Sequence, residues 1–235
     1  RKNKIQFKIT SMDIKNLTDK YHTNKANYTD SKYNETLLRS DFLDPFFELL
    51  GWDIKNTSGK PTNEREVILE EGLKESKLSN TKKPDYTFRL FSERKFFLEA
   101  KKPYVKIEAD NETAKQVRRY GFTAKLKISV LSNFEYLMIY DTSVKVEKDD
   151  VFTRALIKKY HYTEYVEKFE EIYTLLSKEV VYNGEFDKTW EFIETQLNQF
   201  SVDKLFLTQI NKWRVELGNE IFNYNKTISE QELND

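Results

Sequence analysis

The chain has 235 residues, of which 38% are hydrophobic and 33% charged, and its 39 basic side chains balance its 39 acidic ones. This length fits one large domain, or one domain with an appendage, and either can bury a core. The absence of cysteine excludes disulfides and thiolate metal sites, and two histidines make a zinc site or a histidine-based triad improbable. No stretch approaches the run of about 20 apolar residues that a membrane span needs, and no signal-peptide pattern opens the chain, so we expect a cytoplasmic protein without a membrane partner.

The N-terminal part contains one clear predicted helix. The chain starts at Arg1 rather than at a methionine, so we expect a piece of a longer protein or a processed one. Residues 1–30 are polar with a weak helical spacing, and we interpret them as an N-terminal extension. Apolar side chains recur at helical spacing over residues 31–50, although Pro45 should break or restart that helix. Glu35 on this helix either points toward the interior edge of the domain or is a first-turn acid favoured by the helix dipole.

Residues 84–103, which read PDYTFRLFSERKFFLEAKKP, are predicted to form a β-hairpin. Two runs of strand-forming residues flank a polar turn at residues 92–94. Because side chains alternate along a strand, Glu99 and Lys101 share one face. A three-residue turn would set Asp85 opposite Lys101 on that face, so two carboxylates and an ammonium would converge.

Such a set of side chains suits a magnesium site. Carboxylate oxygens are the hard ligands that Mg²⁺ prefers, and a neighbouring lysine can orient or help to deprotonate a metal-bound water. The alternative is a surface hairpin whose charged side chains are merely solvated. The hairpin sequence alone leaves both interpretations open.

The segment after the hairpin is predicted to contain a helix and two buried strands. The helix begins after Asp110 and ends at Gly121, which places Gln116 and Tyr120 on one face. No acid occurs between Glu112 and Glu135, a window that holds Lys115, Arg118, Arg119, Lys125 and Lys127. This basic strip is either a surface that attracts phosphates or a solvated helix face.

The order of predicted elements defines the fold class. Residues 66–70, 128–131 and 136–140 are strand candidates, the last two buried. With the hairpin and the helices they predict a mixed sheet flanked by helices, an α/β domain over residues 31–150. Residues 151–235 are predicted to be a helical connector.

The motif residues resemble a known nuclease superfamily. Pro84-Asp85, thirteen further residues, Glu99-Ala100-Lys101, and then Gln116 to Tyr120 resemble the PD-(D/E)xK motif with its downstream QxxxY motif. The helix with Glu35 resembles the N-terminal helix of the nuclease domains in type I restriction subunits and type IIG restriction-modification enzymes. The resemblance covers residues 30–145 and implies a restriction-endonuclease-like mixed central sheet flanked by helices, followed by an all-helical C-terminal region.

The resemblance also implies an activity, that of a type II, IIG-like site-specific deoxyribonuclease dependent on Mg²⁺, with Mn²⁺ as a substitute. Asp85, Glu99 and the carbonyl of Ala100 would bind the metal. Lys101 would position or activate the attacking water, Gln116 would organise the site, and Glu35 matches the N-terminal acidic residue of the family. The residues expected to contact DNA are Lys102, Arg118, Arg119, Tyr120 and Lys125.

Further partners are implied by the same resemblance. The substrate would be double-stranded DNA, and a transient dimer would cut both strands. The helical tail resembles the connector to an adenine-specific methyltransferase, yet no NPPY-type tetrapeptide and no S-adenosylmethionine-binding glycine motif occurs here. The chain is thus similar to an excised nuclease half or a standalone relative. We expect methyltransferase and target-recognition domains in the same full-length polypeptide, and S-adenosylmethionine is needed only if that methyltransferase domain is present.

Two other interpretations remain open from the sequence. The chain could be a catalytically silent DNA-binding or scaffold module that keeps the nuclease fold. It could also be a structural α/β protein with a coincidental motif, in which case Asp85 and Glu99 should lie far apart.

Overall fold

The computed structural model describes residues 2–72, 83–191, 210, 213, 216 and 217, with the side chains of residues 2–11 left out of the description. Residues Arg1–Trp190 form one compact unit and Glu191–Asp235 a second one. Both predicted domain boundaries, at residues 30 and 150, fall inside the first unit. The helices expected after Trp190 lie outside the described residues, apart from residues 191, 210, 213, 216 and 217, which are helical.

The first unit is built on a six-stranded sheet in the order β1-β2-β3-β4-β5-β6. The strands are β1 (Val67–Leu69), β2 (Tyr86–Leu90), β3 (Glu93–Ala100), β4 (Ile128–Ser132), β5 (Tyr136–Asp141) and β6 (Leu156–His161). Strands β3 and β4 run parallel and every other neighbouring pair is antiparallel. The predicted mixed sheet is therefore confirmed.

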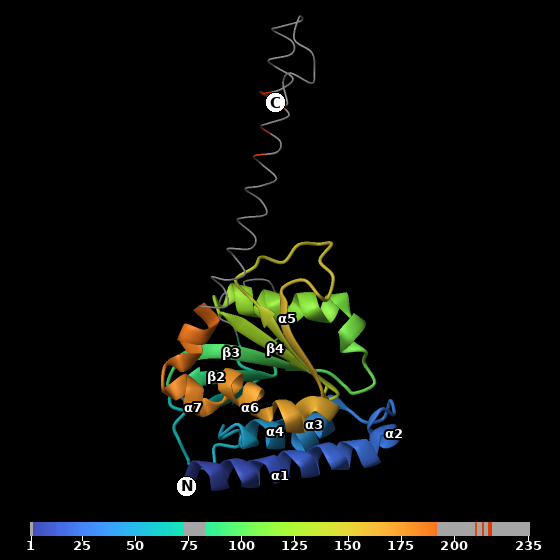
Figure 1. The fold of residues 1–235 in the computed structure, drawn as a ribbon, viewed down its shortest axis with the longest axis vertical. Helices are drawn as coiled ribbons and strands as arrows, with labels where there is room; N and C mark the ends of the chain where they lie inside the picture. The colour runs from blue at the N-terminus through green and yellow to red at the C-terminus, as the bar shows by residue number, and fades with distance from the viewer. Residues whose placement is uncertain (1, 73–82, 192–209, 211–212, 214–215, 218–235) are drawn as a thin grey trace, which may run out of the picture. The chain divides into compact units, whose positions relative to one another are not determined.

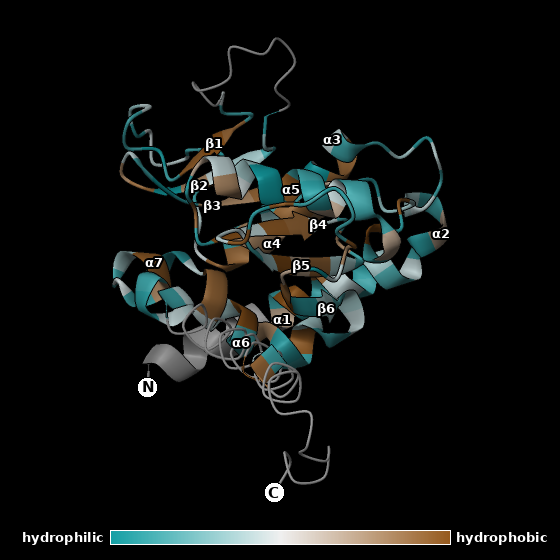
Figure 2. Ribbon diagram, turned by 90° about the horizontal axis from the view of Figure 1, so that it is seen from above, coloured by the Kyte–Doolittle hydropathy of each residue, from teal (hydrophilic) through white to brown (hydrophobic). Residues whose placement is uncertain are grey.

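Helices cover both faces of this sheet (Figure 1). Helix α5 (Asn111–Thr123) lies on one face. On the other lie α1 (Lys2–Thr23), α4 (Asp44–Leu49), α6 (Tyr165–Leu176) and α7 (Lys178–Tyr182). The short helical elements are α2 (Lys25–Tyr28), α3 (Glu35–Leu38), η1 (Arg39–Leu43), η2 (Ile107–Ala109) and η3 (Tyr162–Glu164). Figure 2 shows apolar strands enclosed between helices with polar outer surfaces, the arrangement that burial of a two-sided sheet requires.

Aromatic side chains fill both layers of the core. On the α4 side, the rings of Phe88 and Phe96 stack with their centres 4.4 Å apart, and Trp52 packs edge-on against both. On the α5 side, Phe97 packs with Tyr120. Because Phe96 and Phe97 are consecutive, their opposite positions follow from strand alternation.

The N-terminal residues correct one sequence prediction. Residues 1–30 are not an extension, because α1 packs into the compact unit and buries Ile14 and Tyr21 completely. The ring of Tyr21 lies 5.3 Å from that of Phe42 and 4.9 Å from that of Tyr162. The partners of this weakly amphipathic helix are distant in sequence, so its local pattern could not reveal its burial.

The helix predicted over residues 31–50 is continuous through Pro45. Between α3 and α4 the backbone widens into the π-helical turn η1, and Pro45 falls in the first turn of α4. Because η1 runs into α4 without a gap, Pro45 lies inside the helix and lacks the N–H that would bond to the preceding turn, and the wider π-helical turn accommodates it. The expected break is therefore replaced by a local widening.

Two further predictions are corrected. The region after residue 151 is not wholly helical, since β6 pairs antiparallel with β5. Its lysines lie on an edge strand, where charged side chains are common, and they obscured the strand pattern. Gly121 does not end its helix, since α5 continues to Thr123. None of the helices in the described part of the chain is long and apolar enough to cross a membrane.

Candidate active site

The hairpin of β2 and β3 brings the predicted site residues to one end of the sheet. Tyr86 faces Leu98 and Leu90 faces Glu93, so the turn is shorter than the predicted three residues. A bulge between these pairs adds one residue to β3. The register at the open end of the hairpin is consequently two residues from the predicted one. A shift of two residues preserves the faces of a strand, so Asp85 still lies on the side of Glu99.

All five predicted catalytic residues line one pocket. Its lining residues are Glu35, Glu70, Lys83, Asp85, Glu99, Lys101 and Gln116. They come from α3, the end of β1, the hairpin and α5, which are separate along the chain. A coincidental motif would have been supported by Asp85 and Glu99 lying far apart, and the two residues instead line the same pocket.

Glu99 is the most buried acid of the pocket, with 4% of its surface exposed. Its Oε1 accepts hydrogen bonds from Lys101 Nζ at 2.6 Å and from Gln116 Nε2 at 2.7 Å. Its Oε2 is buried and has no hydrogen-bond partner. Burial raises the pKa of Glu99 to about 7, with Lys101 opposing the shift and the charge of Asp85 adding to it.

Asp85 lies just before β2 and uses its two oxygens differently. Oδ2 accepts a hydrogen bond from the backbone N–H of Ala100 at 2.7 Å. Oδ1 lies 3.4 Å from Nη1 of Arg39. Burial raises the pKa of Asp85, although the hydrogen bond from Ala100 and the nearby cations counteract the shift.

Lys101 and Gln116 fix the orientation of Glu99. The backbone N–H of Lys101 donates to Ser132 O at 3.0 Å, which ties the end of β3 to β4. Burial alone would lower the pKa of Lys101, but the attraction of Glu99, Glu35 and Asp85 together outweighs burial and the pKa is raised. Lys101 is therefore a charged hydrogen-bond donor. Gln116 Nε2 also donates to the hydroxyl of Tyr120 at 2.9 Å, so the QxxxY pair forms one chain of contacts to Glu99.

Helix α3 contributes the predicted residue Glu35, and the residue directly after the helix, Arg39, was not predicted as part of the site. Glu35, in the first turn of α3, lines the pocket, and its negative charge helps to raise the pKa of Glu99. Arg39, one turn further on, contacts both Asp85 and Glu70. Its position four residues after Glu35 places both on one helix face, a signal that was available in the sequence.

The residues predicted to contact DNA divide into buried and exposed ones. Arg118 is 1% exposed, and its guanidinium pairs with Asp150 at 2.7 Å, so the prediction of a DNA contact is corrected to an internal ion pair. Tyr120 is 8% exposed and packs in the core, which leaves its hydroxyl for Gln116. Lys102 is half-buried, whereas Arg119 and Lys125 are exposed.

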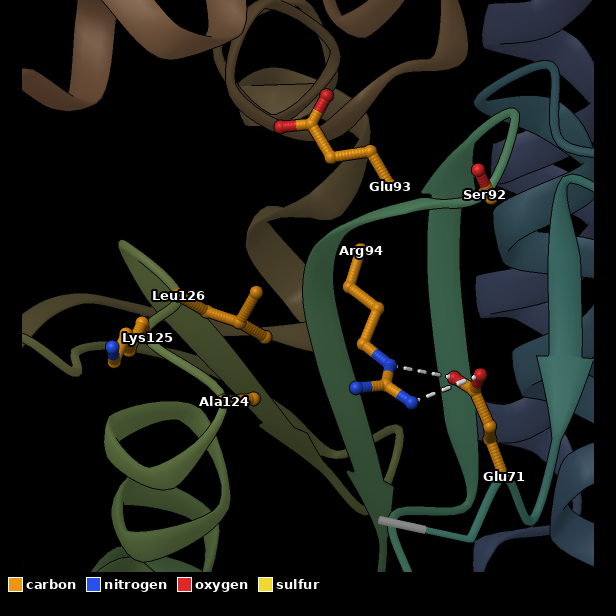
Figure 3. A pocket seen from close by; sticks show the side chains of 7 residues that line it. All are labelled: Glu71, Ser92, Glu93, Arg94, Ala124, Lys125 and Leu126. Carbon is orange, nitrogen blue, oxygen red and sulfur yellow. Dashed lines mark hydrogen bonds and ion pairs between the residues drawn. The ribbon is translucent and has the colours of Figure 1, made fainter. Parts of the chain in front are cut away.

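A second pocket lies near the turn of the hairpin (Figure 3). It is lined by Glu71, Ser92, Glu93, Arg94, Ala124, Lys125 and Leu126. Arg94 reaches across it and makes two hydrogen bonds to Glu71, at 3.0 and 3.2 Å (Figure 3). The charge of Arg94 is thus partly neutralised, and Lys125 is the exposed cation of this pocket.

The oxygen ligands for a metal are few. Within the described ranges no group of three or more Asp, Glu, His or Cys side chains is arranged to hold a metal ion. The described site instead offers Asp85 and Glu99, beside the backbone of Ala100. Further coordination would therefore have to come from backbone oxygens, water or substrate, which is usual for Mg²⁺.

A mixed sheet flanked by helices, with acids and a lysine at the open end of a central hairpin, is the arrangement that the sequence resemblance to restriction endonucleases predicts. No protein-family model matches the chain. Over 222 residues the chain is 59% identical to the type II restriction enzyme and methyltransferase RM.Eco57I of Escherichia coli, which confirms the resemblance to restriction-modification enzymes. The match covers 94% of this chain and 22% of that protein, so the chain spans less than a quarter of its relative.

A solved structure was also found. The crystal structure of the type IIG restriction endonuclease BpuSI matches with a TM-score of 0.38 and 17% identity. That match covers 62% of this chain and 17% of the BpuSI chain.

Proposed function

We propose that this chain is the Mg²⁺-dependent endonuclease domain of a IIG-like restriction-modification enzyme and hydrolyses phosphodiester bonds in double-stranded DNA. The observation that carries this proposal is the free Oε2 of Glu99. An acid buried to this degree without a partner for one oxygen costs free energy unless another group compensates it. A bound cation is the natural compensation, because the pocket around it holds a second acid, Asp85.

The residues of the pocket fit a magnesium ion. Glu99 Oε2 and Asp85 Oδ1 are carboxylate oxygens, and the carbonyl of Ala100 follows Glu99 directly at the end of β3. When bound, Mg²⁺ supplies an activated water and neutralises charge on the phosphate. Mn²⁺ prefers similar oxygen ligands and should substitute.

The side chains of the chain itself have distinct tasks in this proposal. Lys101 donates from its charged ammonium, so it positions the attacking water and stabilises the charge that develops on the phosphate. Gln116 holds Glu99 in place, and Tyr120 supports Gln116. Glu35 adds negative charge at the rim of the pocket and helps to attract a cation.

Cations on the surface of this unit would hold the DNA backbone. Lys102 follows Lys101 directly, and Arg119 lies on α5 three residues after Gln116. Lys125 lies just beyond the end of α5 and lines the second pocket. Contacts of these residues to phosphates would position DNA without reading its sequence.

The remaining parts of the proposal concern the full-length protein. The relative is named a restriction enzyme and methyltransferase, and this chain spans 22% of it. We therefore expect methyltransferase and target-recognition domains elsewhere in the polypeptide, with S-adenosylmethionine as the methyl donor. Because one site cuts one strand, a transient dimer would be needed for a double-strand break.

The test is plasmid cleavage by the full-length protein with Mg²⁺. Asp85→Ala, Glu99→Ala and Lys101→Ala should each reduce nicking by at least about a hundredfold, since each removes a ligand or a charge at the reacting phosphate. Glu112→Gln is the matched control, because Glu112 is an exposed acid of α5 outside the pocket. Circular dichroism would verify that each variant is folded.

Two results separate this proposal from a silent DNA-binding module. If the wild type cuts and all three variants cut equally well, the catalytic assignment is wrong. If the wild type binds DNA without cutting in either Mg²⁺ or Mn²⁺, the module that keeps only the nuclease fold is the better description.

A further inference from the structure

Arg39 is held rigidly at the edge of the pocket. Its guanidinium carbon lies 4.8 Å from the centre of the Tyr86 ring, a cation–π distance. The hydroxyl of Tyr86 donates to Asp44 at 2.7 Å, which fixes the ring under the guanidinium. The side chain of Arg39 is 15% exposed. Arg39 is therefore placed by packing, and its contacts in the pocket are not those of a freely moving surface arginine.

One nitrogen of Arg39 contacts two acids. Nη1 lies 3.3 Å from Glu70 Oε1 and 3.4 Å from Asp85 Oδ1, so both contacts are long. The other oxygen of Asp85 already accepts a hydrogen bond from Ala100 N. Arg39 therefore contacts Oδ1, which is the oxygen of Asp85 that remains able to bind a cation.

Glu70 is held beside Arg39 by an unusual backbone. Its φ is 52°, in the left-handed region, which a non-glycine residue adopts at an energetic cost. Its backbone N–H donates to the carbonyl of Asp85 at 3.0 Å. This contact ties Glu70 to Asp85 and keeps its carboxylate within reach of Arg39.

We infer that Arg39 is a positioning residue that takes the place of the metal at Asp85 and transfers to Glu70 when the metal binds. In the metal-free protein its positive charge compensates Asp85. A divalent cation at the same oxygen would repel the guanidinium of Arg39, and the carboxylate of Glu70, already 3.3 Å from Nη1, offers the guanidinium a second acceptor. This inference rests on the proposed metal site and adds a determinant of its affinity.

Direct metal binding tests the inference without reference to cleavage. Mn²⁺ binding to the full-length protein without DNA would be followed by the electron paramagnetic resonance of free Mn²⁺, with Asp85→Asn giving the background. Arg39→Gln should bind Mn²⁺ at least about fivefold tighter, because it removes the competing charge. Arg39→Lys keeps the positive charge and should bind Mn²⁺ less tightly than Arg39→Gln, although lysine does not reproduce the stacking of arginine on Tyr86. Glu70→Gln should weaken Mn²⁺ binding about threefold, because the neutral amide of glutamine accepts the guanidinium of Arg39 less strongly than a carboxylate does.

Thermal unfolding supplies a second readout. A ligand stabilises the state that it binds by an amount that grows as its dissociation constant falls. The rise in melting temperature on adding Mn²⁺ should therefore be larger for Arg39→Gln than for the wild type. A merely structural arginine would lower the melting temperature and leave this rise unchanged or smaller.

The possible results distinguish a failure of the inference about Arg39 from a failure of the proposed metal site. A wild type that binds Mn²⁺, with Arg39→Gln binding equally or more weakly, overturns the inference and leaves the proposed function standing. A wild type that shows no Mn²⁺ binding above Asp85→Asn overturns the metal site, and the inference with it. If Arg39→Gln does not fold, the exposed Glu70→Gln decides, and unchanged binding in that variant overturns the inference.

Discussion

The buried carboxyl group of Glu99 lowers the stability of the folded protein. Its partners Lys101 and Gln116 both donate to Oε1, which leaves the buried Oε2 uncompensated. Burial outweighs the attraction of Lys101, so the pKa of Glu99 rises from its usual 4.5 to about 7. The more exposed Lys101 keeps its charge, because the three acids Glu99, Glu35 and Asp85 together raise its pKa by more than burial lowers it. A carboxylate disfavoured in this way is typical of a functional site rather than of a structural ion pair.

The first prediction concerns the pH dependence that Glu99 produces. Between pH 4.5 and 7, Glu99 is deprotonated in the unfolded chain but still protonated in the folded protein. The contribution of Glu99 to the free energy of unfolding therefore falls as the pH rises through this window and is constant above it. Glu99→Gln cannot ionise and should be more stable than the wild type at pH 8 by about 1–3 kcal/mol, a difference that narrows toward pH 5. Urea unfolding without metal at several pH values measures it.

The exposed acid Glu112 provides the control for this prediction. Glu112→Gln changes the same chemical group on a side chain that is 76% exposed, and it should not alter the pH dependence. If Glu99→Gln is less stable than the wild type at pH 8, the ion pair with Lys101 stabilises the protein by more free energy than the burial of the Glu99 charge costs. Saturating Mn²⁺ should reverse the order of stability, because only the wild type gains a ligand there.

At the scale of elements, α5 aligns Gln116 with Glu99 through a close approach to the sheet. A Cβ atom on Gly121 would lie 2.5 Å from Ser129 Oγ and 2.5 Å from Thr142 Cγ2. Real Cβ atoms do not come so close, so only glycine allows the helix to lie at this distance. The distance between α5 and the sheet therefore determines whether the side chain of Gln116 can contact Glu99 at the end of β3.

Gly121→Ala is accordingly expected to destabilise the protein by about 2–4 kcal/mol, despite the higher helix propensity of alanine. It should also reduce DNA cleavage at temperatures where the variant remains folded, because the shift of α5 moves Gln116 away from Glu99. Chemical denaturation measures the first effect and plasmid nicking the second. Gly72→Ala is the matched control, since its added Cβ would meet only Lys83 Cε at 3.7 Å, an ordinary contact. Equal stability of both variants would mean that α5 can move away from the sheet at little cost.

The elements that the sequence predicted well are those with strong local patterns. β4 and β5 are continuous apolar runs, and the hairpin has strand-forming residues on both sides of a polar turn. The exact register was not predictable, because it depends on a bulge that no local residue type marks. β6 was missed because its lysines lie on an edge strand, where the alternation of apolar and polar residues is blurred. Its identity as a strand is decided by pairing with β5.

In the site, too, local patterns were predicted correctly, whereas contacts between distant residues were not. Asp85 and Glu99 were predicted correctly as pocket neighbours, since the period of a strand survives a register shift of two residues. Arg118 was misinterpreted because its partner Asp150 lies 32 residues away, and a run of basic residues does not show which of them are buried. Arg39 shares a helix face with Glu35, but that spacing does not show its contacts to Asp85 and Glu70, which come from other elements.

At the scale of the whole molecule, the chain after residue 150 completes the core under the sheet. Tyr165 packs 5.1 Å from Phe46 and donates from its hydroxyl to Phe134 O at 2.8 Å. Phe186 packs 5.8 Å from Phe96, and the indole of Trp52 donates to Leu176 O. These contacts join the two sides of the expected boundary, so residues 31–150 depend on the later helices for a complete core.

The last prediction is that a fragment of residues 1–150 does not fold cooperatively, whereas residues 1–191 do. The shorter fragment loses β6 and the buried side chains Tyr165, Phe169, Ile172, Leu176, Phe186 and Trp190. Each large buried side chain contributes about 1.5–3 kcal/mol, so the combined loss of these six is as large as the 5–15 kcal/mol by which a typical domain is stable. Thermal unfolding followed by circular dichroism would compare the fragments, and amide hydrogen exchange would locate the protected strands. A cooperative transition of the 1–150 fragment near that of the longer one would mean that the sheet and α5 suffice, and that β6 and α6 are a separable addition.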